Sequence, residues 1–312
     1  MTGAVVLATE QGLGYMAKDF YDNRVIQKVF IHPHGSRQNH PEWYKPEDRL
    51  QNLGQLLECD SIVFFENPFY WKLIPMAREK GVKTVLFPMY ECTPYPLFYE
   101  PDLILTPSAL DKQYYPNSVQ IIVPVDIPWK LRTKARVFVH NGGNGGLGGR
   151  NGTKEVLEAM QYVKSPIKLI VRSQIALGTS KDPRVDIRVG TVEKDELWSI
   201  GDVFLFPEKF NGLSLPIQEA YASGMGIMCA SRFPMTDWLP HDLMIPVESY
   251  RKERIAVEFD SAVIHPKAIA QKIDQWYNKD ITKFSRLGRN FGKQNSWKKL
   301  APQLIKLCEN IR

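Results

Sequence analysis

Short apolar runs rich in β-branched residues recur along the first 125 residues of the chain, and helix-compatible stretches separate them. Such continuous runs are typical of strands covered on both faces, as they are in parallel sheets. We therefore expect residues 1–125 to form an α/β unit of parallel strands joined by crossover helices. The expected strands are AVVLA, VIQKVFI, SIVFFE, VKTVLF, DLILT and VQIIV.

The same alternation begins again after the segment PVDIPWKLRTK, whose two prolines disfavour the interior of a helix or a strand. We therefore expect a linker at 126–135 and a second doubly wound α/β unit at 136–280. Its helices are expected from about Thr153, around KDELWSI and over Leu215–Ser223. The expected strands are RVFVH, IKLIVR, VDIRVG, DVFLFP, GIMCA and LMIPV.

Residues 281–312 are expected to form basic C-terminal helices that pack back across the two units. They hold eight Lys and Arg residues and one acid, whereas the other 280 residues hold 32 basic and 33 acidic ones. This excess indicates either a solvated helix face or a surface for nucleic acid or anionic membrane. The last helix has apolar residues three or four positions apart, the spacing of one helix face: Trp297, Leu300, Leu304, Leu307 and Ile311.

Length and composition narrow the class of protein. A chain of 312 residues suits about two domains, and its 44% hydrophobic content can give each a core. The N-terminus lacks the features of a secretory signal, and no apolar stretch approaches the length of a membrane span. The four cysteines are scattered without a C-x-x-C pair, which suits a reducing compartment and argues against structural zinc. We therefore expect a cytoplasmic protein.

The segment VFVHNGGNGGLGGRNGTKEVLEAM, residues 137–160, places a glycine-rich loop between an expected strand and an expected helix. Gly143, Gly145 and Gly148 match the G-x-G-x-x-G spacing of dinucleotide-binding loops. A nicotinamide site also uses an acid at the end of the next strand, where this chain has Arg172. A nicotinamide enzyme with a phosphorylated cofactor stays open. A kinase-type P-loop is excluded, because no Gly-Lys-Ser/Thr triplet closes the loop.

The same loop has the ingredients of a diphosphate site. Glycines leave backbone N–H groups unshielded, and the start of a helix carries positive potential. Arg150 and Lys154 add mobile cations beside it. Gly145, Gly146 and Gly149 are therefore expected, together with Lys154, to bind the phosphates of a nucleotide.

A second segment, PEKFNGLSLPIQEAYASG, follows a buried strand and leads into a helix. It resembles the donor-site signature P-S-x-x-E-G-F-G-L-P-x-x-E-A-x-A-x-G of retaining glycosyltransferases of the GT-B fold, family four. GGRNGTKEVLEAM, VDIRVGTVEKDELWSIGDVFLFP and DLILTPSALDKQYY also resemble segments of that family. The resemblance covers residues 102–231 well and the rest only by architecture. The matching signature positions are Pro207, Gly212, Leu215, Pro216, Glu219, Ala220, Ala222 and Gly224.

The resemblance implies an α/β protein of two Rossmann-like doubly wound domains with an interdomain cleft. It implies retaining transfer of a hexose or pentose from a nucleotide-diphosphate sugar, a UDP-sugar above all, to an acceptor hydroxyl, without a metal or another cofactor. The acceptor would be either hydroxymethylated pyrimidine in DNA, as in phage DNA-modifying enzymes, or a surface or lipid-linked glycan. Two other classes stay open: a nicotinamide-dependent oxidoreductase, and a non-catalytic protein that binds sugar nucleotides or nucleic acid. The sequence indicates no oligomeric state.

The resemblance also implies roles for single residues. Glu219 would hold the donor ribose hydroxyls, since one carboxylate can accept two hydroxyl hydrogen bonds. Arg150 and Arg172 would stabilise the departing diphosphate, the task that a metal performs elsewhere. Backbone amides at the start of the helix would contact the donor as well, and these belong to Gly212, Leu213 and Ser214.

The chain departs from the signature at Asn211, which stands where the family has its first glutamate. An amide can still hydrogen-bond the donor, so Asn211 is expected among the donor-binding residues. It supplies no negative charge beside the sugar, however. Glu208, three residues earlier, is a candidate to supply that charge if the loop bends.

Several residues of the first unit are expected at the carboxyl ends of strands, where open α/β sheets bind ligands. Gly12 and Gly14 lie where the first strand turns into the first helix, and Glu66 ends SIVFFE. We expect these three on the acceptor side. Glu91 follows the next strand, and Glu66 and Glu91 are the two candidates to orient the acceptor hydroxyl.

The loop HPHGSRQNH holds three histidines, His32, His34 and His40. An H-x-H pair with a third histidine in a loop is weak evidence for a metal site. We expect the loop to contribute to acceptor binding instead.

Overall fold

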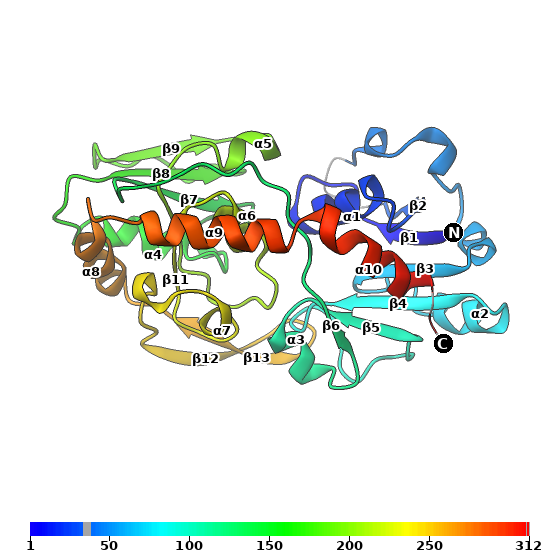
Figure 1. Cartoon of the computed structure of the whole chain (residues 1–312). Helices are drawn as coiled ribbons and strands as arrows, with labels where there is room; N and C mark the ends of the chain where they lie inside the picture. Colours follow the sequence, from blue (N-terminus) through cyan, green and yellow to red (C-terminus); the bar gives the residue numbers. More distant parts are fainter. Residues whose placement is uncertain (34–38, 310, 312) are drawn as a thin grey trace. The chain divides into compact units, whose positions relative to one another are not determined.

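The computed structural model describes residues 1–33, 39–309 and 311, and the chain divides into two compact units (Figure 1). Unit 1 comprises Met1–Pro124, Arg254–Glu258 and Ser296–Arg312. Unit 2 comprises Val125–Glu253 and Phe259–Asn295. Residues 126–135, expected as a linker, therefore lie in unit 2.

Unit 1 is built on a six-stranded sheet of order β2-β1-β3-β4-β5-β6, whose paired strands run parallel. Three crossover helices join consecutive strands of this sheet. The strands are β1 (Thr2–Val6), β2 (Lys28–Ile31), β3 (Ser61–Glu66), β4 (Lys83–Pro88), β5 (Leu103–Thr106) and β6 (Val119–Gln120). The helices are α1 (Gly12–Asp22), α2 (Leu73–Glu79), α3 (Ala109–Tyr114) and, from the end of the chain, α10 (Trp297–Glu309).

Helix α10 packs on unit 1 through the apolar face predicted from its spacing. Trp297 is buried, and its ring meets that of Phe20 edge-on with centroids 5.2 Å apart. Phe20 also contacts Phe65 and Phe87 from two neighbouring strands in the same edge-to-face manner. Such pairs add to the free energy gained from burial alone, so the last helix is an integral part of the first unit.

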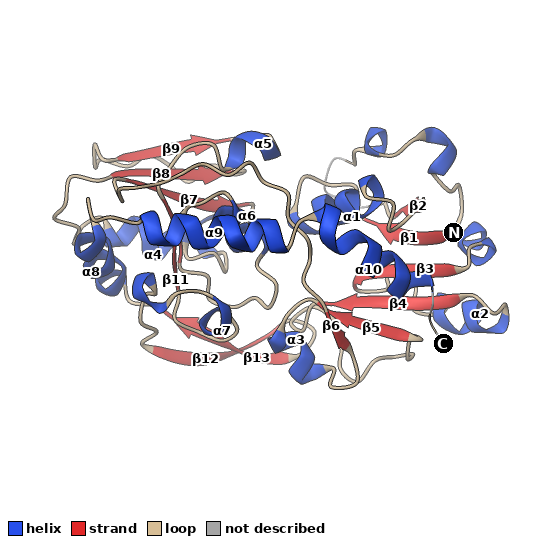
Figure 2. Cartoon of the chain, viewed as in Figure 1, coloured by secondary structure: helices blue, strands red, loops and turns tan. Residues whose placement is uncertain are grey.

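Unit 2 contains a five-stranded parallel sheet of order β11-β10-β7-β8-β9 (Figure 2). Its strands are β7 (Val137–Gly143), β8 (Lys168–Ser173), β9 (Val185–Val189), β10 (Val203–Phe206) and β11 (Gly226–Cys229). Its helices are α4 (Thr153–Ala159), α5 (Lys194–Leu197), α6 (Leu215–Ala222), α7 (Met235–Trp238), α8 (Pro266–Trp276) and α9 (Thr282–Gln294). Two doubly wound parallel sheets confirm the predicted α/β fold class.

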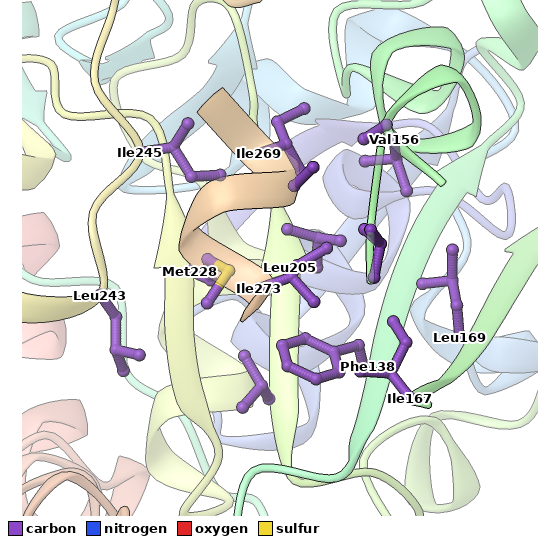
Figure 3. Packing of buried hydrophobic residues seen from close by; sticks show 14 of the residues in the cluster. Phe138, Val156, Ile167, Leu169, Leu205, Met228, Leu243, Ile245, Ile269 and Ile273 are labelled. Carbon is purple, nitrogen blue, oxygen red and sulfur yellow. The ribbon is translucent and has the colours of Figure 1, made fainter. Parts of the chain in front are cut away.

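One face of this sheet is covered by α4 and α8. Ile269 and Ile273, one turn apart on α8, point toward the strands and pack with Phe138 and Leu205 in one buried cluster (Figure 3). Branched aliphatic side chains fill such a layer between helix and sheet at close packing density. This core packs the strands and helices whose connecting loops lie at the carboxyl edge of the sheet.

The structure corrects the prediction in two regions. Of the expected strand VQIIV, only Val119–Gln120 pair in the sheet. LMIPV was expected to be a full strand, but it contributes only an isolated bridge between Ala230 and Ile245. The chain instead forms a two-stranded sheet of β12 (Ser249–Arg254) and β13 (Glu258–Val263). Most of β12 is exposed and charged, so it lacks the apolar runs by which the buried strands were recognised.

The C-terminal helices divide between the units, since α9 belongs to unit 2 and α10 to unit 1. Across residues 1–33, 39–309 and 311, none of the helices has the length and apolar character required to cross a lipid bilayer.

Candidate functional site

The carboxyl edge of the unit 2 sheet gathers three segments that the sequence singled out. Strand β7 leads into the glycine loop, β8 ends with Arg172 and Ser173, and β10 leads into the loop 207–214 before α6. Because these three strands are adjacent and parallel, their ends meet at one edge. This is the edge at which open α/β sheets bind ligands.

The glycine loop has a shape that side chains would prevent. Gly152, which precedes α4, has a φ of 78°, and a Cβ there would lie 2.5 Å from the carbonyl oxygen of Pro207. The chain also passes itself closely, because a Cβ on Gly149 would lie 2.9 Å from the Cα of Gly145. Glycine is therefore required where this loop approaches the loop 207–214.

The loop is further held by Asn151. Its side-chain amide donates to the carbonyls of Asn141 and Gly142 at 3.2 and 3.0 Å. Gly146 is buried with a positive φ, whereas Gly145 is exposed. These contacts and backbone angles define the shape of the loop.

The second loop is organised by the side chain of Asn211. Its Nδ2 donates to Glu208 Oε1 at 2.9 Å, and its Oδ1 accepts from the amide of Ser214 at 3.1 Å. Ser214 has a φ of 46° and precedes α6. Within the described part of the chain, the backbone amides of the buried residues Gly212 and Leu213 donate to no acceptor. Buried donors of this kind are rare and need a partner, which a bound anion can provide.

Arg150 lies against this loop. Its Nε is 3.6 Å from Glu208 Oε1, and its guanidinium stands over the ring of Phe210 at 5.7 Å. Lys154 is more remote from these contacts: its side chain is exposed and pairs with Glu158 one turn along α4 at 3.8 Å. Of the two expected cations, Arg150 is therefore the better placed to contact a ligand bound at the loop 207–214.

Arg172 and Glu219 form hydrogen bonds with two consecutive residues, Leu197 and Trp198. Arg172 donates to the carbonyl of Leu197, and the indole of Trp198 donates to Glu219 Oε2 at 3.2 Å. Arg172 is 6% exposed, and its Nε has no acceptor among the described residues. Burial and the neighbouring Arg188 lower the pKa of Arg172, although a guanidinium stays charged at neutral pH. The Arg172 guanidinium is therefore bound through Nη1 and keeps its Nε–H without a protein acceptor among the described residues.

His140 is a residue of this region that sequence analysis did not single out. It is fully buried at the centre of β7, where Nδ1 contacts the Leu205 carbonyl at 2.8 Å and Nε2 contacts the Thr153 hydroxyl at 2.9 Å. Burial lowers its pKa to about 4, so the ring is neutral at physiological pH. His140 ties β7 to β10 and to the first residue of α4. A histidine that ends an apolar run was its only signal in the sequence.

The acceptor-side candidates lie at the carboxyl edge of the unit 1 sheet. A Cβ on Gly14 would lie 2.1 Å from the carbonyl of Thr9, so the turn into α1 requires glycine there, whereas Gly12 has open space around it. Glu66 ends β3 with a φ of 62°, and its carbonyl accepts from the Thr93 hydroxyl. Left-handed backbone at a non-glycine residue is strained and often accompanies function.

Glu91 lies in the loop after β4, where it is 2% exposed. Its carbonyl accepts from the amide of Ala256 in the β12–β13 turn at 3.0 Å. The preceding residue, Tyr90, donates its amide to the buried carboxylate of Asp111 at 2.8 Å. The loop that carries Glu91 is therefore fixed from two sides.

The histidine loop is only partly described, since His34 lies outside the described residues. His40 stacks on Trp43 with centroids 5.0 Å apart, and its Nδ1 lies 2.8 Å from Glu42 Oε1. Within the described residues, no three His, Cys, Asp or Glu side chains cluster as a metal site requires.

The structure thus brings together Arg150, Asn211 and the amides of Gly212 and Leu213, and it joins Arg172 to Glu219 through residues 197 and 198. Gly12, Gly14, Glu66 and Glu91 belong to the other unit. Sequence reasoning missed Arg232 and Trp198, which hold site residues by contacts that only the folded chain makes.

No family model and no curated protein matches this sequence. Solved structures match over nearly the whole chain. HepE of Anabaena in complex with UDP and glucose has a TM-score of 0.68 and 12% identity, with 98% of each chain covered. Sucrose-phosphate synthase of Thermosynechococcus elongatus has a TM-score of 0.65 and 12% identity, covering 98% of this chain and 97% of that one.

A glycosyltransferase of Rickettsia africae has a TM-score of 0.64 and 12% identity, covering 99% of this chain and 98% of that one. Identities this low carry the fold and no more. The chain therefore has the GT-B fold of these glycosyltransferases.

Proposed function

We propose that this protein is a glycosyltransferase that takes its sugar from a UDP-sugar. The proposal is supported by groups suited to an anion at the carboxyl edge of unit 2: the amides of Gly212 and Leu213, which have no acceptor among the described residues, and the cations Arg150 and Arg172. Oriented amides at a helix start and nearby guanidiniums are suited to a diphosphate. The similarity in fold to HepE, solved with UDP and with UDP-glucose, supports the choice of donor.

In this proposal Glu219 binds the ribose hydroxyls of the donor. Its orientation is set by the indole of Trp198, and an ionised carboxylate can accept several hydrogen bonds at once. Arg150 and Arg172 stabilise the negative charge that grows on the diphosphate as the bond to the sugar breaks. Because these cations are fixed by the fold, we propose transfer that needs no metal.

We propose that the sugar, a hexose or a pentose, is transferred with retention of its anomeric configuration. The support is the resemblance of residues 207–224 to the signature of retaining enzymes. In such a reaction the departing phosphate takes the proton of the attacking hydroxyl on the same face of the sugar. The stereochemistry of the product, read from proton couplings at the anomeric carbon, tests this point.

We propose that the acceptor binds to unit 1, where Gly12, Gly14, Glu66 and Glu91 lie at the carboxyl edge of the sheet. Both acceptor classes, hydroxymethylated DNA and a surface or lipid-linked glycan, are retained as proposals. A basic face on α9, with four exposed cations and no acid, suits either a phosphate backbone or an anionic surface. Steep salt dependence of duplex binding distinguishes DNA, and sedimentation with anionic vesicles distinguishes a membrane-bound acceptor.

The deciding experiment measures binding and turnover of a panel of nucleoside-diphosphate sugars. We expect micromolar binding of UDP and release of UDP from at least one UDP-sugar, unaffected by a chelator. Mass spectrometry with hydroxymethylated DNA and with glycan acceptors then identifies the product. Binding of NADPH in place of UDP would instead favour the oxidoreductase alternative, which the glycosyltransferase neighbours do not favour. UDP-sugar binding without turnover on any acceptor would favour the non-catalytic alternative.

A further inference from the structure

A buried ion pair lies at the base of the loop 207–214. Glu208 and Arg232 are 2% and 5% exposed, and Glu208 Oε2 lies 3.4 Å from Arg232 Nη2. A carboxylate at this depth is costly unless its charge is paired and its oxygens accept hydrogen bonds. Both conditions are met here, so the ion pair is compatible with its burial in unit 2.

Arg232 also holds the backbone of the loop. Its Nε donates to the Glu208 carbonyl at 2.9 Å, and its Nη1 donates to the Asn211 carbonyl at 3.0 Å. A guanidinium presents these donors in a rigid planar fork, which fixes the relative position of the groups it contacts. The ends of the segment 208–211 are therefore held by one side chain.

The other oxygen of Glu208 faces the candidate donor site. Oε1 accepts from Asn211 Nδ2 at 2.9 Å and lies 3.6 Å from Arg150 Nε. Asn211 in turn accepts from the amide of Ser214, directly before α6. One carboxylate thus connects Arg150 to the turn that carries the free amides of Gly212 and Leu213.

We propose that Glu208 is a positioning residue of the donor site, and the inference rests on the proposed function. Asn211 carries no negative charge, but its side-chain amide donates a hydrogen bond to the negatively charged carboxylate of Glu208. Glu208 acts on the diphosphate through Asn211 and Arg150 rather than by contact with the sugar.

Two electrostatic effects oppose each other in this arrangement. A carboxylate near a diphosphate repels it, but two guanidiniums lie within 4 Å of Glu208, so the cluster remains net positive. Removing the carboxylate leaves Arg232 buried without its counter-charge and removes the ion pair between Glu208 and Arg150. The loss of alignment therefore outweighs the relief of repulsion.

The test compares UDP with uridine, which lacks the diphosphate, as ligands of the full chain in calorimetry. In Glu208→Gln we expect the dissociation constant for UDP to rise about tenfold, the equivalent of one hydrogen bond to a charged group. Binding of uridine should change less than about twofold, because alignment of the phosphate-binding groups does not affect the nucleoside. General damage to the unit would weaken both ligands equally and would overturn the inference, as would unchanged or tighter UDP binding.

A double variant that moves the negative charge from position 208 to position 211 makes the test specific to that charge. The double variant Glu208→Gln with Asn211→Asp moves the carboxylate to the second partner and keeps a hydrogen bond between them, so it should recover most of the lost UDP affinity. Asp182→Asn is the matched control: it removes a carboxylate paired with Arg184 at 2.7 Å in the segment that precedes β9, at the opposite edge of the sheet. It should bind UDP as the wild type does.

If Glu208→Gln fails to fold, Asn211→Ala breaks the same connection without leaving a buried charge and should show the same UDP-specific loss. Equal affinity of Asn211→Ala for UDP would contradict the inference. Wild-type protein that binds no UDP would contradict the proposed function itself. Wild-type binding with unaffected variants would contradict only the role of Glu208.

Discussion

The indole nitrogen of Trp198 donates a hydrogen bond to Oε2 of Glu219 at 3.2 Å. Trp198 is 2% exposed, and its ring packs edge-on against Phe204 of β10 with centroids 5.0 Å apart. The rotamer of this tryptophan is therefore set by the core of unit 2. Glu219, on the first turns of α6, is therefore oriented by a hydrogen-bond donor that is buried and packed in the core.

Replacement of Glu219 by alanine should reduce the affinity for UDP by about tenfold to a hundredfold, since each hydrogen bond to a charged group contributes about 1.5–3 kcal/mol. Trp198→Phe keeps the ring in the core and removes only the N–H donor, so it should cause a smaller loss in the same direction. Calorimetry with UDP measures both. Affinity for UDP that is independent of Glu219 would contradict its assignment to the ribose.

Replacement of Arg172 by glutamine should slow release of UDP from a UDP-sugar by about a hundredfold and weaken binding of the UDP-sugar by a smaller factor, because charge on the diphosphate is greatest in the transition state. Its neighbour in the sheet provides the control. Arg188 pairs in register with Arg172 but is exposed and bound to Asp186 at 2.8 Å. Arg188→Gln should leave the rate unchanged, and an equal loss in both variants would argue against a specific role for Arg172.

Alanine at Gly152 should destabilise unit 2 by about 2 kcal/mol or more, since a left-handed residue costs about 1–2 kcal/mol and the new Cβ also meets a backbone atom. The contact is with the Pro207 carbonyl, so the loop 207–214 should shift and UDP binding should weaken. Gly148→Ala is the control, because a Cβ there meets nothing within 4 Å. Thermal unfolding and UDP titration of the two variants check the prediction, which fails if the variants behave alike.

His140 should make unit 2 less stable in acid. Its pKa is about 4 in the folded chain, against 6.5 for an unperturbed histidine, so between these pH values the unfolded chain binds more protons. Stability should fall as the pH drops from about 6.5 to about 4, by about 3 kcal/mol in all. His140→Gln lacks this dependence, so the wild type minus variant difference in free energy of unfolding should itself fall as the pH drops from about 6.5 to about 4.

The variant must be compared with the wild type because Asp111 gives the stability of the chain the opposite pH dependence. Burial raises the pKa of Asp111 in unit 1 to about 7, so its contribution to stability falls as the pH rises from about 4 to 7. Comparing His140→Gln with the wild type at each pH removes this background. A difference that stays constant from pH 7 to pH 4 would show that His140 does not titrate in this way.

Much of the architecture was predictable from the chain alone. Buried parallel strands need apolar side chains at every position, so runs such as SIVFFE and DVFLFP predicted β3 and β10 directly. The exposed hairpin of β12 and β13 was missed because strands with a charged face lack that signal.

Spacing and local backbone preference act between near neighbours, so the two α/β units, the glycine loop and the helix start at Leu215 were predictable from the amino-acid sequence. The folded chain was needed to show that Arg232 holds the loop 207–214, that the Glu208 carboxylate accepts a hydrogen bond from Asn211, and that Trp198 orients Glu219. The Arg232 and Trp198 contacts join residues more than 20 positions apart. Their geometry depends on strand order and core packing, which no local pattern encodes.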